Sequence, residues 1–134
     1  MDKYFKIVDG ELLEYYGNGG DLIIPDSVTR IADEVFAENK SLTSVFIPAS
    51  VRWIGHMAFK CCSNIVRFEV DENNEFLCSI DGDLYTKDET ELINYAQGKD
   101  DASISIPDGV TYIRNVVFKG CKSLEQVHIP NTVN

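Results

Sequence analysis

Apolar residues recur along this chain in a pattern that repeats about every 23 positions. Three stretches show it: "IPDSVTRIADEVFAEN" (24–39), "IPASVRWIGHMAFKCC" (47–62) and "IPDGVTYIRNVVFKGC" (106–121). In each, a valine follows the proline by three residues, an isoleucine follows the valine by three, and a phenylalanine comes five residues later. This period lies within the roughly 20 to 29 residues of leucine-rich repeats. The pattern therefore predicts stacked coils that share one core.

Each unit divides into two extended stretches and a turn. The alternating apolar positions of 42–47 predict a short strand that stacks on residues 65–70 of the next coil. Proline cannot donate to a strand ladder, so the proline that follows ends this strand. Val51 and Ile54 then point inward from a second extended stretch, and Phe59 closes the far side from a short helical turn. We expect an α+β solenoid made mostly of short β-strands with short helical turns.

One unit is longer than the others, which predicts an insertion. The second and third prolines of the pattern are 59 residues apart, which is 23 plus 36, so this unit carries 13 extra residues. The segment "FLCSIDGDLYTKDETELINYAQGK" (76–99) has turn signals at Asp81-Gly82 and at 87–90 between apolar runs, and these predict a three-strand β-meander. Residues 8–12 echo residues 80–84 and predict a β cap at the N-terminus.

These boundaries predict a single domain over residues 1–134. Its parts are an N-terminal β cap (1–21), repeats (22–75), the β-meander insertion (76–99) and further repeats (100–134), the last of them incomplete. No following coil in the sequence covers the apolar slots of the last unit. We therefore expect association through this open C-terminal coil, as a homodimer or with further repeats. A monomer whose last coil frays is the alternative.

The repeated motifs resemble those of BspA-like leucine-rich repeat proteins. That family repeats units of the form L-x-x-I-x-I-P-x-S-V-T-x-I-G-x-x-A-F-x-x-C, matched here by Ile47–Val51, Ile54-Gly55, Ala58-Phe59 and Cys62. It interrupts them with a segment matched by Asp71–Asn74 and Ser79–Tyr85. Ala32, Asn39 and Val117 depart from the pattern. The resemblance implies a curved, right-handed solenoid that recognises proteins, and family members include bacterial surface proteins that adhere to host proteins.

The charge balance narrows the range of partners. The 134 residues include 12 Lys and Arg against 22 Asp and Glu, for a formal net charge of −10. Such a surface repels phosphate backbones and anionic lipids, so we expect no nucleic-acid partner. No apolar run approaches the length of a membrane span, so we expect no membrane insertion. Residues 1–10 contain no apolar signal-peptide core. A complete chain would be cytoplasmic, whereas a fragment of a longer exported protein would lie at the cell surface or be secreted.

Candidate chemistry is sparse. Cys62 and Cys121 share with Asn39 the slot three residues after the repeated phenylalanine, which favours a structural role in a tight bend over the alternative of a redox or metal site. The four cysteines form no C-x-x-C pair, and we expect all of them to be free thiols. His56 and His128 fall in different slots, and no phosphate loop or G-x-S-x-G motif is present. We therefore expect no enzyme activity, no cofactor and no metal.

The strand periodicity predicts which side chains face outward on the concave sheet. One column is Ile23, Phe46, Glu69, Ser105 and His128, and its neighbour is Asp21, Ser44, Arg67, Ser103 and Gln126. Adjacent apolar side chains at Ile23 and Phe46 within a polar ridge are typical of a binding face. The alternative is that the cap or the insertion covers them. Arg30, Trp53 and Tyr112 form a second column, in which Arg30 stacked on Trp53 would have a structural use.

The repeats, the resemblance and the missing catalytic motifs predict a non-catalytic protein–protein interaction scaffold. The resemblance implies bacterial adhesion to host proteins. We expect a protein partner to bind the concave face, through Ile23, Ser44, Phe46, Arg67, Glu69, Ser103, Ser105, Gln126 and His128. The alternative is a structural or self-assembling fragment of a larger protein without a ligand of its own.

Overall fold

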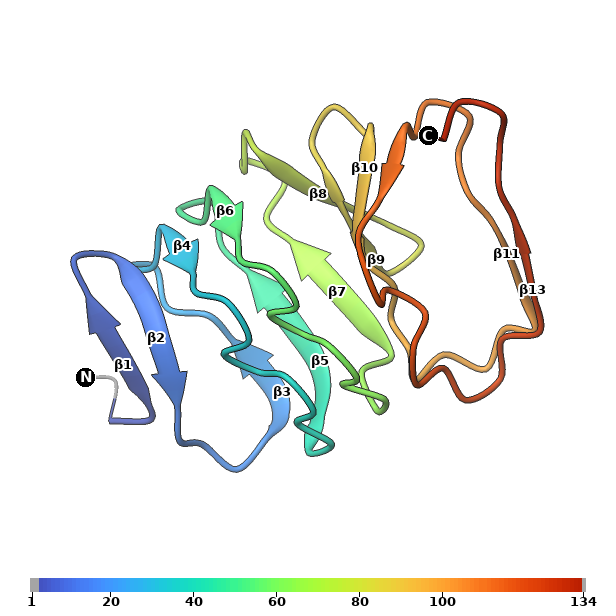
Figure 1. Ribbon diagram of the computed structural model, residues 1–134. Coiled ribbons are helices and arrows are strands. Elements are labelled where there is room, and N and C mark those ends of the chain that lie inside the picture. Colours follow the sequence, from blue (N-terminus) through green and yellow to red (C-terminus); the bar gives the residue numbers. More distant parts are fainter. Residues whose placement is uncertain (1–2, 134) are drawn as a thin grey trace.

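Two sets of parallel strands run along the molecule, one of longer and one of shorter strands (Figure 1). The computed structural model describes residues 3–133, so residues 1, 2 and 134 of the expected cap and last repeat lie outside the described part. The chain forms a β-solenoid of about five turns whose units lie about 23 residues apart. The repeated pattern predicted this architecture correctly.

The longer strands form the first ladder. They are β3 (Gly20–Ile23), β5 (Leu42–Ile47) and β7 (Arg67–Val70), followed after the insertion by the separate parallel pair β11 (Ser103–Ser105) and β13 (Gln126–His128). The register pairs Val45 with Leu22 on one side and with Phe68 on the other, and all three side chains are buried. The alternation of residues 42–47 and their stacking on residues 65–70 are therefore confirmed.

The shorter strands form the second ladder. β4 (Arg30–Ile31) and β6 (Trp53–Ile54) are parallel and follow β2 (Glu11–Tyr15), while β1 (Phe5–Val8) pairs antiparallel with β2 at the end of the sheet. A second short ladder begins with the last strand of the insertion, where β10 (Glu91–Asn94) pairs in parallel with β12 (Tyr112–Ile113). The short-strand ladder is thus interrupted between β6 and β10.

The turn after each proline has the same hydrogen bond in every unit. The N–H groups of Val28, Val51, Val110 and Val133 donate to the carbonyls of Pro25, Pro48, Pro107 and Pro130, with N···O distances of 3.1, 3.3, 3.1 and 3.3 Å. Proline offers no N–H to the ladder and its φ is fixed, so it ends the strand and favours this turn.

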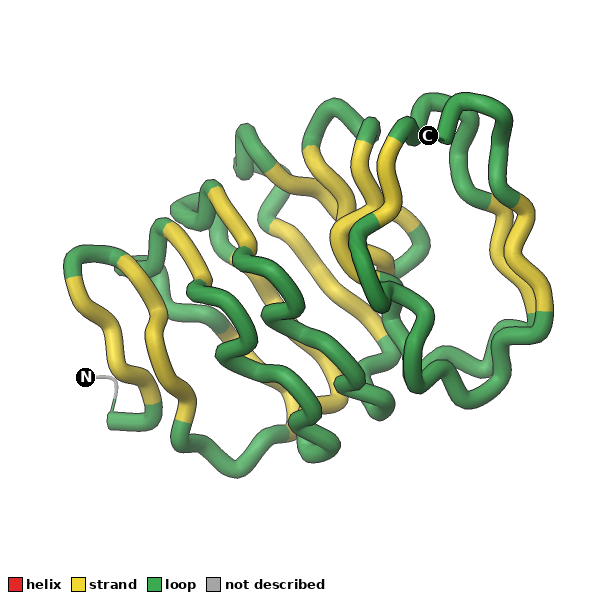
Figure 2. Tube along the Cα trace, viewed as in Figure 1, coloured by secondary structure: helices red, strands yellow, loops and turns green. Residues whose placement is uncertain are grey.

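The segment that carries the repeated phenylalanine is a turn, and the expected short helical turn was wrong. No helix occurs within residues 3–133, as the absence of red in Figure 2 shows, and none therefore could cross a membrane. In each unit, two residues of this segment have positive φ. They are Glu34 (60°) and Glu38 (62°), Met57 (55°) and Cys61 (56°), and Val116 (57°) and Gly120 (89°). Left-handed residues four positions apart prevent an α-helix from forming.

The insertion is an antiparallel meander. Its strands are β8 (Leu77–Ile80), β9 (Asp83–Thr86) and β10. Asp81 and Gly82 join β8 to β9 with φ values of 53° and 84°, the two positive values that a tight type I′ hairpin requires. The carbonyl of Gly82 accepts a hydrogen bond of 2.7 Å from the N–H of Phe68 in β7. The meander therefore lies against β7 and separates it from β11.

The N-terminal hairpin starts the short-strand ladder in the way that β10 restarts it. In the N-terminal hairpin, the carbonyl of Gly10 accepts hydrogen bonds from the N–H groups of Thr29 and Arg30, and the carbonyl of Leu12 accepts one from Ala32. In β10 and the residue before it, the carbonyl of Thr90 accepts from Thr111 and Tyr112, and the carbonyl of Leu92 accepts from Arg114. In the sequence, residues 8–12 resemble residues 80–84. The two Asp-Gly turns do share their φ values, but the ladder contacts make 10–12 equivalent to 90–92, because β10 is the strand that continues into the ladder.

The core consists of two clusters. The larger one holds Phe36 and Phe59, each 1% exposed, with ring centroids 5.0 Å apart and an interplanar angle of 5°. The smaller one is shared by the insertion and the repeats that follow it, and includes Tyr95 and Val117. The repeat pattern places Phe118 in the same slot as Phe36 and Phe59 and so predicts its burial, but Phe118 is only partly buried, because no further coil packs over it within the described chain.

Candidate functional site

The outward side chains of β3, β5 and β7 form one surface, called here the long-strand face. Its residues are Asp21, Ile23, Ser44, Phe46, Arg67 and Glu69. The parallel register places Ser44 between Asp21 and Arg67, and Phe46 between Ile23 and Glu69. Sequence periodicity predicted the pairing within both rows correctly, because one residue of slip would have turned the apolar side chains outward.

Hydrogen bonds and an ion pair hold the polar side chains of this face. Asp21 Oδ1 accepts from the hydroxyls of Ser44 at 2.7 Å and Thr43 at 3.1 Å. These two bonds, the one from Ser44 first, lower the pKa of Asp21. Ser44 is only 7% exposed, so its hydroxyl positions the Asp21 carboxylate and offers little surface to a partner. Arg67 and Glu69 are exposed and pair at 3.6 Å, which gives the face a charged side.

Apolar surface remains open beside these charges. Ile23 is 67% exposed, so neither the cap nor the insertion covers it, and Phe46 is half-buried. A hollow of about 320 Å³ adjoins Ile23, and its lining includes Tyr4, Phe5 and Tyr15. The sequence pattern contains no signal for this hollow, because only the folded cap brings Tyr4 next to Ile23.

The other predicted residues of the face form a second patch. Ser103, Ser105, Gln126 and His128 are exposed and pair across β11 and β13. The turn between β8 and β9 separates them from β7, since a Cβ placed on Gly82 would lie 3.3 Å from Cβ of Arg67. The expectation that each column runs along one sheet through all five residues was therefore wrong, because the insertion divides the ladder into β3-β5-β7 and β11-β13.

On the opposite ladder, charged and aromatic side chains form a row. The Arg30 guanidinium lies 4.2 Å from the centre of the Trp53 ring and 3.5 Å from the Glu11 carboxylate. The predicted stacking of Arg30 on Trp53 is thus confirmed. Tyr112, expected in the same column, belongs to the second short ladder, where it pairs with Glu91.

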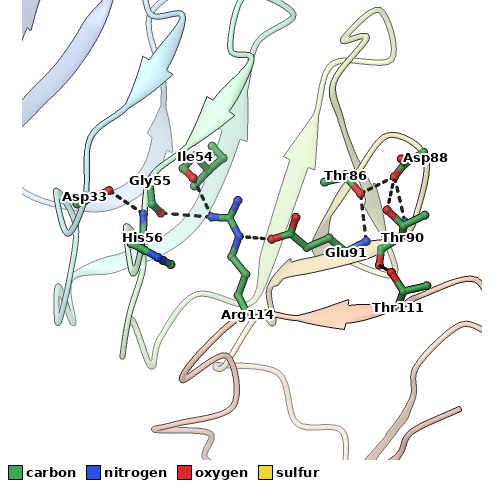
Figure 3. Close-up of polar contacts among 10 residues, drawn as sticks. All are labelled: Asp33, Ile54, Gly55, His56, Thr86, Asp88, Thr90, Glu91, Thr111 and Arg114. Carbon is green, nitrogen blue, oxygen red and sulfur yellow. Dashed lines mark hydrogen bonds and ion pairs between the residues drawn. The ribbon is translucent and has the colours of Figure 1, made fainter. Parts of the chain in front are cut away.

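Arg114 bridges the interruption between the two short ladders (Figure 3). Its Nε donates to Glu91 Oε2 at 2.5 Å, and its Nη1 donates to the carbonyls of Ile54 at 2.8 Å and Gly55 at 3.4 Å. Because Ile54 ends β6 and Glu91 begins β10, one side chain connects both ladders. The other units have Ala32 and Gly55 in this slot, so the repeat pattern contains no signal for the bridge.

The repeats match a known family. A model described as the BspA type leucine rich repeat region matches six copies over residues 11–86 and 94–134. The chain belongs to the BspA-type leucine-rich repeat family. This family is typically a repeat scaffold, and the match indicates no catalytic family. No curated protein sequence matched the chain.

Several solved structures share this BspA-type fold. A leucine-rich repeat protein from Eubacterium ventriosum is similar with a TM-score of 0.82 and 26% identity, over 85% of this chain and 30% of that chain. The pneumococcal vaccine antigen PcpA is similar with a TM-score of 0.77 and 28% identity, over 80% of this chain and 26% of PcpA. A leucine rich cell surface protein from Faecalibacterium prausnitzii shares the fold with a TM-score of 0.59 and 23% identity, over 99% of this chain and 43% of that chain. The chain spans less than half the length of each.

The cysteine slot of these BspA-type repeats makes structural contacts here. Cys62 Sγ donates to the carbonyl of Phe36 in the preceding coil at 3.0 Å, while Asn39 Oδ1 accepts from the N–H of Ser41 at 2.9 Å. Burial raises the pKa of Cys62 to about 11. A thiol is nucleophilic and metal-binding as the thiolate, so this environment favours packing over reactivity.

The acidic segment that interrupts BspA-type repeats also has a structural explanation. Asn74 is 1% exposed, and its Nδ2 donates to the carbonyls of Pro48 at 3.0 Å and Val51 at 2.9 Å. Its Oδ1 accepts from the N–H groups of Phe76 and Leu77, both at 2.8 Å. The side chain thus fastens the start of the insertion to the preceding proline turn. Residues 3–133 contain no group of three or more His, Cys, Asp or Glu arranged to hold a metal ion.

Proposed function

We propose that this chain is a non-catalytic scaffold that binds a protein partner through the long-strand face. The observation that carries the proposal is the exposure of Ile23, at 67%, beside half-buried Phe46 and the hollow next to Tyr4. Apolar side chains in the middle with charged groups at the side are the usual anatomy of an interface. Arg67 and Glu69 supply the charged side.

We further propose that the partner is a host protein and that the chain acts at a bacterial surface. The similarity to PcpA, a pneumococcal vaccine antigen, supports this setting. Membership of a repeat family supports a binding role, because stacked repeats present a long, continuous surface to partners. The net charge of −10 favours a partner with a basic patch, through long-range attraction.

The test compares partner binding by the wild-type chain and by face variants. Host extracellular proteins retained by the immobilised chain are identified, and their affinities are measured with purified protein. Phe46→Ala combined with Arg67→Glu should weaken binding more than tenfold, about 1.4 kcal/mol, because a hot-spot contact and a favourable charge are both lost. Ile23→Ala, at an exposed position, tests the same face without removing core packing.

The control is Lys60→Glu combined with Lys119→Glu, on the turns that carry the phenylalanines. This pair should leave affinity within about twofold, because neither residue lies on the long-strand face. Equal or greater loss from the control pair, with none from Ile23→Ala or the double variant, would contradict the proposal. Thermal unfolding of each variant excludes loss of binding through unfolding.

A second candidate function, self-association, is favoured by the last coil. Ile129 is 56% exposed, whereas Ile24, Ile47 and Ile106 in the same slot are 1%, 0% and 4% exposed. A second copy, or further repeats, would cover such a surface and pair with the free edge of β13.

A further inference from the structure

The interruption of the short-strand ladder leaves a pocket on the surface. Within residues 3–133, the sheet that begins with β1 ends at β6, and the next short ladder begins with β10. Between them lies a hollow of about 200 Å³ lined by Trp53, Ile54, His56, Glu91, Tyr112 and Arg114. This hollow is on the ladder opposite the long-strand face, so an inference about it stands apart from the proposed protein binding.

Two aromatic rings contribute to the lining. Trp53 is 39% exposed and Tyr112 is 46% exposed, although large aromatic side chains usually bury most of their surface. The guanidinium of Arg30 already stacks on Trp53 at 4.2 Å from the ring centre. Trp53 therefore holds the Arg30 guanidinium and also lines the hollow.

The polar part of the lining is an ion pair held in a fixed position. Arg114 donates through Nε to Glu91 Oε2 at 2.5 Å and through Nη1 to two backbone carbonyls, as Figure 3 shows. The side chains of Arg114 and Glu91 are 17% and 24% exposed, so they are sheltered but reachable. Arg114 Nη2 and Glu91 Oε1 have no hydrogen-bond partner among the described residues. The pair therefore offers one donor and one acceptor side by side.

Charge decides which class of ligand fits. The charges of Arg114 and Glu91 compensate each other, so the pair gives an ionic ligand little net attraction, whereas a neutral ligand that both donates and accepts can use the two free atoms. The faces of aromatic rings carry negative partial charge and attract the weakly positive C–H groups of a sugar ring. At about 200 Å³, the hollow is below the roughly 300 to 1,000 Å³ of sites for drug-sized ligands, so it suits a single ring.

We propose that this pocket binds one pyranose ring of a neutral saccharide. The C–H face of the ring packs against Trp53 and Tyr112, and neighbouring hydroxyl groups bond to Glu91 and Arg114. A terminal sugar of a glycan and a free sugar share this chemistry.

The chain contains one tryptophan, so its fluorescence reports on the pocket directly. The probes are the methyl glycosides of glucose, galactose, mannose and N-acetylglucosamine, added to the full chain. At least one should change the Trp53 emission saturably, with a dissociation constant on the order of 1 mM, as expected for so small a contact. Saturation-transfer NMR should show the strongest transfer to the C–H protons of the ring face.

Tyr112→Ala is the decisive variant, because its side chain is exposed and makes no hydrogen bond to the described residues. It should weaken glycoside binding at least fivefold, and Tyr112→Phe should retain it. Tyr16→Ala is the matched control, since Tyr16 is a 57% exposed aromatic residue in the cap. Arg114→Lys should also weaken binding, with its thermal unfolding measured in parallel because this residue joins the two ladders.

Three results would overturn the proposal: no response to any of the four glycosides at tens of millimolar, unchanged binding by Tyr112→Ala, or a saturable response to N-acetylargininamide or acetate instead. Retention of the chain on an immobilised glycoprotein with the same terminal sugar would identify a glycan as the source. Binding of the glycoside alone would identify a free sugar, and both outcomes support the pocket as a saccharide site.

Discussion

At the scale of single residues, stacked aromatic rings stabilise the first coils. Phe59 lies between Phe36, with ring centroids 5.0 Å apart, and Phe68, whose ring it meets edge-on at 5.2 Å. Tyr15 of the cap extends the row at 5.3 Å from Phe36. Each ring fills the space left by the previous coil, so the loss of one ring creates a cavity between two coils.

Phe59→Ala should therefore lower the free energy of unfolding by about 3–5 kcal/mol, the usual cost of removing a buried phenylalanine. Phe118→Ala is the control, and its loss should be clearly smaller because Phe118 is only partly buried. Urea unfolding followed by tyrosine and tryptophan fluorescence measures both. A change under about 1 kcal/mol for Phe59→Ala, or a larger one for Phe118→Ala, would contradict this account of the core.

The cysteines provide a second prediction at this scale. Unfolded, unreduced protein should show four reactive thiols, one for each cysteine. In the native protein at mildly alkaline pH, Cys62 and Cys121 should be alkylated slowly, because burial raises the pKa of each to about 11 and keeps the thiolate scarce. Their labelling should accelerate as the pH approaches that value. Mass spectrometry of labelled peptides measures each site, and fewer than four thiols in the unfolded protein would count against the prediction.

At the scale of elements, individual hydrogen bonds take the place of strand pairing at the insertion. The ladder stops at β6, and Arg114 spans the interruption with three hydrogen bonds. On the long-strand side, the carbonyl of Gly82 takes the place of the next strand for Phe68. An ion pair joins β9 of the insertion to the segment that follows β10, where Lys99 Nζ meets the buried Asp83 Oδ2 at 2.9 Å.

Arg114→Ala should reduce stability by about 1.5–3 kcal/mol, since it removes hydrogen bonds to a charged group and leaves Glu91 unpaired. Arg67→Ala is the control: its ion pair with Glu69 is exposed, and its loss should stay below about 1 kcal/mol. Hydrogen exchange should also show faster exchange in β12 for Arg114→Ala. Equal stability losses for the two variants would refute a bridging role.

At the scale of the whole molecule, the two ends of the solenoid differ. The hairpin of β1 and β2 covers the first short strands, and Tyr15 packs into the core cluster. In the last coil, Phe118, Leu124 and Val127 are only partly buried. A solenoid needs a cover at each end, because an open coil exposes apolar side chains and an unpaired strand edge.

Self-association through the last coil should thus depend on protein concentration. Light scattering over a wide concentration range should show a mass above that of one chain, and Ile129→Lys should shift the equilibrium towards the monomer, because a buried charge without a partner is costly. Ile23→Lys, at a similarly exposed isoleucine on the long-strand face, is the control and should have little effect. A monomer at every concentration, with a well-protected β13 in hydrogen exchange, would leave no support for association.

The sequence by itself determined the coil, its period and which side chains point inward. Each coil packs on a nearly identical neighbour, so the alternation in 42–47 and the proline turn carry the register from one unit to the next. It also determined the Asp81-Gly82 hairpin and the stacking of Arg30 on Trp53, because both depend on short-range chemistry or on adjacent equivalent slots. The helical turn was misjudged, because nothing in the residue types at Glu34 or Met57 signals a positive φ.

Only the tertiary structure decided what happens at the insertion. The contacts of Arg114 with Ile54 and of Lys122 with Asn64 join residues 60 and 58 positions apart, and these pairs have no counterpart in other units. Periodicity carries no information about such contacts, since they arise where the period breaks. The division of the long-strand columns and the pocket between Trp53 and Tyr112 follow from the same cause: the meander takes the place of a coil and moves the later repeats away from the earlier ones. The hollow beside Ile23 depends instead on the packing of the folded cap against β3.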